Sequence, residues 1–162
     1  MSTVRELSVK DAEFPFTANA AFLIDAQYRP YIAFDAATDE NCYWTFPMPQ
    51  GVSGTLTLYL QYRMASATSG NVIMAAAVEA ITDGDATDTD AGSSFDTVNT
   101  SSAEAVPGTA GYKGEMSITL TNADSYAAGD YVRIKLSRDA DNGSDTATGD
   151  LHLLIAELRD AA

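Results

Sequence analysis

Two aspartate-rich segments are the residues of this sequence best suited to hold a cation. The first runs from Asp83 to Asp90 (DGDATDTD) and the second from Asp139 to Asp145 (DADNGSD). Carboxylate oxygens crowded on a loop suit Ca²⁺, which takes about six to eight oxygen ligands. Neither spacing fits an EF-hand, because the invariant glycine is replaced by aspartate in the first segment and comes one position early in the second. Since Asp, Asn and Gly also build ordinary turns, we predict solvated loops without a metal.

The other chemistry-bearing residues form no catalytic pattern. The single histidine, His152, lies in an apolar run, and there is no second histidine for a zinc site. No serine lies in a G-x-S-x-G turn, and no glycine-rich phosphate loop is present. The single cysteine, Cys42, is predicted to be a small buried apolar residue. We therefore predict a non-enzyme without catalytic residues or cofactor; paired carboxylates for glycoside hydrolysis are the open alternative.

The single tryptophan, Trp44, has two interpretations. It lies in the segment CYWTFPMP, where alternation places Trp44 and Phe46 on one face of a strand and Tyr43 and Thr45 on the other. The apolar context favours Trp44 in the core. An exposed Trp44 beside a tyrosine would instead stack on a sugar ring.

The charge balance excludes two classes of partner. The 162 residues carry 23 acidic and 9 basic side chains, which gives a net charge of −14. Nucleic-acid binding and anionic membrane surfaces both require clustered Lys and Arg, so we expect neither partner. The longest nearly uncharged apolar stretch, residues 72–78, is far shorter than the roughly 20 residues that cross a bilayer. Residues 1–11 lack the apolar region of a secretory signal.

Short runs of alternating apolar and polar residues dominate the chain. In residues 55–64 this period of two cannot be segregated onto one face of a helix. Residues 151–158 are apolar at both alternating positions, which predicts a strand buried on both faces. Further strands are expected at 4–10, 22–34, 42–47, 70–82, 94–100, 116–121 and 131–137, with long loops at 83–93 and 139–149. The predicted core residues are Leu56, Leu58, Leu60, Val132, Ile134 and Leu136.

Residues 72–81 (VIMAAAVEAI) suit either a helix or a strand. The alanines favour a helix, whereas the β-branched start and the flanking strand-like runs favour a strand, which we predict. The resulting eight or nine strands indicate an all-β, two-sheet antiparallel sandwich of jelly-roll type. An immunoglobulin-like sandwich is disfavoured, because one cysteine cannot supply the Cys…Trp…Cys spacing.

Several turn and strand segments form a longer pattern. They are FDAATDENCYWTFPMP at residues 34–49, Gly54 with the leucine-rich strand, ASATSG at 65–70, Gly129-Asp130, RDAD at 138–141 and DTATGD at 145–150. Together they resemble jelly-roll proteins encoded among the structural genes of tailed phages. The resemblance covers about residues 30–158, and its motifs are turn and strand signatures, not a catalytic fingerprint.

The resemblance implies a structural role on a virion. The expected function is a capsid decoration (cement) subunit, made in the host cytoplasm, that binds and stabilises the outside of a phage head. The implied partners are the major capsid protein or another virion protein and further copies of this chain, often in a homotrimer. The alternative is a tail- or fibre-associated module that binds a carbohydrate or receptor.

Residues 1–21 precede the expected jelly-roll domain at 22–162. Phe14-Pro-Phe16 favours extended backbone, because proline fixes its own φ and disfavours helix at the residue before it. An extended segment that buries little against its own domain needs a partner for its backbone groups. These residues are therefore either an N-terminal arm that contacts a neighbour or the first strand of the sandwich.

Overall fold

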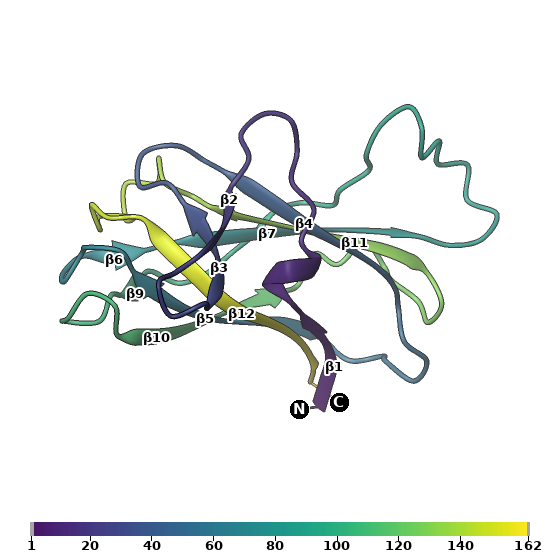
Figure 1. The fold of residues 1–162 in the computed structure, drawn as a ribbon. Coiled ribbons are helices and arrows are strands. Elements are labelled where there is room, and N and C mark those ends of the chain that lie inside the picture. Colours follow the sequence, from purple (N-terminus) through teal and green to yellow (C-terminus); the bar gives the residue numbers. More distant parts are fainter. Residues whose placement is uncertain (1, 162) are drawn as a thin grey trace.

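The computed structural model describes residues 2–161 as an all-β chain with one turn of 3₁₀ helix (Figure 1). Two larger antiparallel sheets enclose a single hydrophobic core, which confirms the predicted jelly-roll sandwich. No helix in this described range is long and apolar enough to cross a membrane. In chain order the elements are β1 (Ser2–Leu7), η1 (Val9–Asp11), β2 (Ala21–Ile24), β3 (Pro30–Phe34), β4 (Asn41–Pro47), β5 (Leu56–Met64), β6 (Asn71–Val72), β7 (Met74–Ile81), β8 (Asn99–Thr100), β9 (Glu104–Ala105), β10 (Lys113–Leu120), β11 (Tyr131–Arg138) and β12 (Leu151–Asp160).

The six-stranded sheet is built around β12. On one side β12 pairs with β5, and β10 extends the sheet beyond β5. The other side of β12 is shared by two strands, since β3 pairs with its first residues and β1 with its last ones. β2 pairs with β3 and ends the sheet. The N-terminal and C-terminal strands therefore lie side by side in the same sheet (Figure 1).

The four-stranded sheet has the order β4-β11-β7-β8. Residues 13–20 run along the free edge of β4, where the N–H of Glu13 donates to the Tyr43 carbonyl at 2.8 Å and that of Ala20 to the Asn41 carbonyl at 3.0 Å. The long loop after β7 returns along this sheet, and the Asp96 N–H donates to the Val78 carbonyl at 2.9 Å. Residues 74–79 are consequently buried on both faces, where small alanines fit.

The period-two pattern places the core correctly. All six predicted core residues, from Leu56 to Leu136, are at most 1% exposed. Residues 72–81 are extended, as predicted, because β7 pairs with β11 at eight successive positions. A helix in this segment would leave the ladder groups of β11 without those partners.

The prediction that residues 151–158 are buried on both faces is wrong. Leu153 pairs with Tyr62 and Ile155 pairs with Gln61, so Leu154 is an extra residue in a β-bulge. A bulge places two successive side chains on the same side of a sheet. Leu154 is half-buried and Ile155 is 41% exposed on the outer face.

The predicted strand at 22–34 is divided into β2 and β3 by a tight turn. The Asp25 Oδ1 atom accepts N–H bonds from Gln27 and Arg29, both at 2.9 Å, and Tyr28 adopts a positive φ of 62°. Aspartate favours such turns because its side chain bonds to backbone two residues on. Elsewhere, only residues 99–100 of the predicted strand at 94–100 are extended in the sheet, and β9 lies outside the predicted strands.

Residues 2–21 contact both sheets. Residues 2–7 form β1, Leu7 and Val9 are buried, and Phe16 is fully exposed. The division of the chain at residue 21 and a contact of this segment with a neighbouring protein stay predictions.

Candidate functional site

A shallow groove crosses the outer face of the six-stranded sheet, over β10, β5, β12 and β1. It consists of two adjoining hollows of about 110 and 300 Å³ that share Gln61, Ile155 and Glu157. We name it the outer-face groove. Its other lining residues are Thr3, Glu6, Tyr59, Leu60, Glu115 and Arg159.

The β-bulge at Leu154 creates the apolar centre of this groove. It turns Ile155 outward and sets it opposite Gln61 of β5. The neighbouring residue Ala156 returns to the core, where it is fully buried. A planar amide thus lies beside an aliphatic side chain, on strands that the sheet holds in register.

An ion pair and an aromatic ring fix the polar groups at one end of the groove. The Arg159 guanidinium lies over the Tyr59 ring, 4.0 Å from its centroid, and its Nη2 donates to Glu157 at 2.7 Å. The Thr3 hydroxyl donates to the same carboxylate from β1. These side chains are already held in place by one another. They therefore lose little conformational entropy when a ligand binds to them.

Two of the lining glutamates, Glu115 and Glu157, have lowered pKa values. The hydrogen bond from Lys113 lowers the pKa of Glu115, and the hydrogen bonds from Arg159 and Thr3 lower that of Glu157. Both carboxylates therefore accept hydrogen bonds at neutral pH.

A cluster of stacked side chains continues this outer face toward β3. The rings of Tyr31 and His152 stack with centroids 4.2 Å apart, and the Arg63 guanidinium lies 5.1 Å from the Tyr31 ring centroid. Arg63 Nη1 also donates to Asp25 in the β2–β3 turn at 2.9 Å. His152 is thus a packed strand residue that contacts both the Tyr31 ring and Arg63, whose Nε donates to His152 Nδ1 at 3.5 Å.

We expect this packing to make the free energy of unfolding depend on pH. Burial, followed by the charge of Arg63, lowers the pKa of His152 below 6.5. The unfolded chain therefore binds the proton more tightly, and stability falls as the pH drops from 6.5 through the lowered folded pKa. Urea unfolding between pH 8 and pH 5.5 measures this slope. His152→Gln should flatten it, and an unchanged slope in that variant would contradict the assignment.

A larger hollow of about 780 Å³ lies at the end of the sandwich, between residues 52–56 and 120–128. Its lining consists mainly of small side chains. Its one aromatic residue, Tyr126, donates its hydroxyl to the Gly54 carbonyl at 2.6 Å. Its carboxylate, Asp96, already accepts N–H bonds from Thr97 and Asp124. The outer-face groove has the richer set of planar polar groups.

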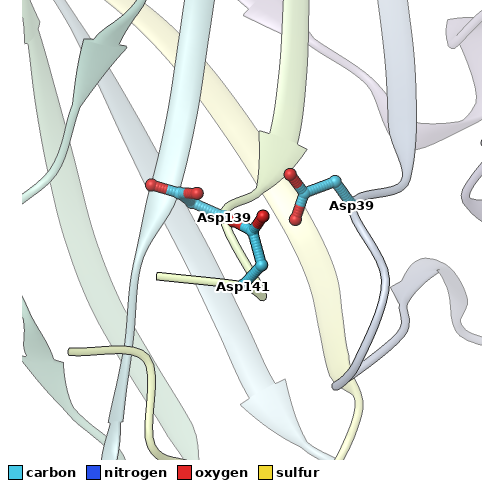
Figure 2. A group of neighbouring side chains, drawn as sticks. All are labelled: Asp39, Asp139 and Asp141. Carbon is cyan, nitrogen blue, oxygen red and sulfur yellow. The ribbon is translucent and has the colours of Figure 1, made fainter. Parts of the chain in front are cut away.

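Three aspartates come together just beyond the C-terminal end of β11 (Figure 2). Asp39 from the β3–β4 loop faces Asp139 and Asp141, and one oxygen of each lies within 4.8 Å of the others. Asp39 accepts the Ala140 N–H at 2.8 Å, and Asp139 accepts the Asn142 side-chain amide at 2.8 Å. These bonds order the loop, and they account for the positions of two of the three carboxylates.

Carboxylates of the first aspartate-rich segment accept hydrogen bonds from nearby backbone. Asp85 accepts the N–H of Thr82 at 2.9 Å, and Asp88 accepts those of Asp90 and Ala91. Within residues 2–161, its carboxylates form no cluster of three with other potential ligands. In the second segment, Asp145 turns inward and pairs with Arg138 at 2.7 Å.

Trp44 and Cys42 lie in the core. Trp44 is 2% exposed, and its Nε1 donates to the Ser8 carbonyl at 2.8 Å. The core interpretation of Trp44 is therefore correct, and the sugar-platform interpretation is wrong, because the ring has no face toward solvent. Cys42 is fully buried, and burial raises the pKa of its thiol.

The residues of the outer-face groove were not singled out in the sequence. They come from four strands, and the groove depends on the bulge and on the β1–β12 register. A visible signal is the presence of polar or charged residues at the outward positions of β5 and β12, where Gln61, Glu157 and Arg159 alternate with core residues.

Similar structures exist among solved proteins, although no protein-family model and no curated protein sequence matches the chain. A family 6 carbohydrate-binding module is similar with a TM-score of 0.50 at 7% identity, over 98% of this chain and 95% of that one. The fold is a jelly-roll sandwich. A second similar structure contains the CBM22-1 and GH10 modules of endo-1,4-β-D-xylanase 10B from Clostridium thermocellum, complexed with xylohexaose. Its TM-score is 0.52 at 11% identity, over 99% of this chain and 28% of that one.

A phage protein is also among the matches. The enzymatically active domain of tailspike protein 4 of bacteriophage CBA120 matches 94% of this chain and 20% of its own, with a TM-score of 0.44 at 7% identity. At such low identities these comparisons concern the fold alone.

Proposed function

We propose that this chain is a non-catalytic carbohydrate-binding module and that the outer-face groove is its binding site. The observation that carries the proposal is the groove itself, in which the apolar side chain of Ile155 lies among an amide, three carboxylates and a guanidinium. A pyranose ring presents apolar C–H groups and neighbouring hydroxyls, so it needs both kinds of contact. Sites with a few placed polar groups around apolar surface are typical of small-ligand binding.

The fold likeness supports this reading over the decoration role. One similar structure is a carbohydrate-binding module, and another is a xylanase fragment complexed with xylohexaose. The capsid decoration role, the virion surface location and the capsid-protein partner stay predictions from the phage resemblance.

The lowered pKa values of Glu115 and Glu157 in the groove support a binding function without hydrolysis. Acid-catalysed glycoside cleavage needs one carboxylic acid whose pKa is raised so that it can donate a proton. In the groove, the pKa shifts of Glu115 and Glu157 are both downward, because each carboxylate accepts a hydrogen bond from a cationic side chain. We therefore expect glycan binding without the release of new reducing ends.

Calorimetric titration of the full chain with xylohexaose, together with a panel of neutral polysaccharides, tests the proposal. We expect Gln61→Ala and Tyr59→Ala each to weaken binding about tenfold or more, since central polar and aromatic contacts carry most of a binding free energy. Thr119→Ala is the matched control, because Thr119 lies exposed on β10 outside the groove. Absence of binding to every glycan, or equal loss in the control, would contradict the proposal.

A further inference from the structure

β2 is an unprotected edge strand. It pairs with β3 on one side, and within residues 2–161 no strand pairs with its other side. Its side chains Phe22, Leu23 and Ile24 are 40%, 45% and 59% exposed. Apolar residues thus face solvent on both faces of the strand, beside a row of backbone groups that can accept another strand.

The edges formed by β10 and β4 are protected. The opposite edge of the six-stranded sheet, β10, carries Lys113 and Glu115. In the four-stranded sheet, the edge of β4 is covered by residues 13–20 through backbone bonds. Charged side chains and covering segments are the usual ways in which proteins block edge-to-edge pairing, and β2 has neither.

The charge distribution identifies the partner that this edge fits. The chain carries a net charge of −14, so two copies repel each other wherever their charged surfaces meet. Residues 14–24 contain no charged side chain, and the next carboxylate, Asp25, is neutralised by Arg63 at 2.9 Å. At this uncharged, apolar strand, a second acidic copy meets less repulsion than at the charged parts of the surface.

We infer that two copies of the chain pair through β2 in an antiparallel, two-fold arrangement. With Leu23 at the centre, Leu23 lies opposite itself, and Phe22 of one copy lies opposite Ile24 of the other. Each pair is apolar, and antiparallel self-pairing supplies hydrogen bonds to both free edges. Two-fold dimers of this self-complementary kind are the commonest form of homo-oligomer.

Such pairing would join the two six-stranded sheets into one continuous sheet. A two-fold axis perpendicular to the sheet keeps both outer faces on the same side, so the two outer-face grooves would point toward one surface. This consequence rests on the proposed function, whereas the pairing itself does not.

Sedimentation velocity of the 162-residue chain across the micromolar range tests the pairing. We expect a concentration-dependent dimer, and we expect Leu23→Lys to raise its dissociation constant about tenfold or more, because it sets two like charges opposite each other. Val98→Lys is the matched control, since Val98 is 52% exposed on another part of the surface, and this variant should dimerise like the natural chain. A monomer at all concentrations, a dimer insensitive to Leu23→Lys, or a trimer would overturn the inference.

A cysteine variant keeps the test decisive if Leu23→Lys fails to fold. Cys42 is fully buried, so in Leu23→Cys the introduced thiol is the accessible one. Mild oxidation should convert Leu23→Cys to a covalent dimer and leave Val98→Cys largely monomeric. Equal cross-linking of the two variants, or none in Leu23→Cys, would overturn the inference.

Glycan titration of Leu23→Lys separates the two proposals, because loss of pairing should leave the affinity of a single groove for xylohexaose unchanged.

Discussion

Replacing Arg138 with methionine is expected to lower the free energy of unfolding by about 3–5 kcal/mol. The side chains of Arg138 and Asp145 are 0% and 1% exposed, and two hydrogen bonds, at 2.7 and 3.0 Å, join them. The same guanidinium donates to the carbonyls of Ala147 at 2.7 Å and Gly149 at 2.8 Å. Arg138→Met would leave a buried carboxylate and two buried carbonyls without these donors. Urea unfolding monitored by circular dichroism measures the loss.

Two comparisons separate this effect from a general loss of positive charge. Lys113→Met removes a cation from the exposed pair with Glu115, and we expect little change in stability. The double variant Arg138→Met/Asp145→Leu removes both buried charges and should recover much of the stability lost in the single variant. If Arg138→Met unfolds like the natural chain, the buried pair does not hold the loop at 139–149.

Replacing Trp44 with alanine is expected to cost about 3–5 kcal/mol, as for other large buried aromatic residues. The indole is 2% exposed, and its Nε1 donates to the Ser8 carbonyl, between β1 and η1. The variant would therefore lose core packing and a bond that ties the N-terminal segment to β4.

The same variant distinguishes a core role of Trp44 from a ligand-binding role. We expect Trp44→Ala to lower the urea midpoint strongly while the folded fraction keeps its affinity for xylohexaose. Tyr131→Ala is the control, because Tyr131 is 46% exposed and lies outside the outer-face groove. A stable Trp44→Ala variant that has lost glycan binding would contradict the assignment.

The local sequence is sufficient to predict most of the longer strands and the inward face of most of these. Alternation in residues 55–64 and 131–137 identifies the core, because side chains alternate across a strand whatever its partner is. The β-branched start of residues 72–81 and the strand-like runs beside them favour a strand over a helix, and the apolar context of Trp44 favours the core.

Only the tertiary structure decides features that depend on which strands meet. The bulge at Leu154 follows from the pairing of β12 with β5, and it turns Ile155 outward although its neighbours in sequence are apolar. Arg138 and Asp145 are charged residues, which usually lie on the surface. In this structure they form an ion pair in the interior. The outer-face groove and the free edge of β2 exist because strands distant in sequence become neighbours. Alternation is a property of one strand, whereas register, ion pairing and edge exposure are properties of strand pairs. For that reason the sequence alone predicts the sandwich and its core, and the assembled sheets determine where a ligand or a second copy can bind.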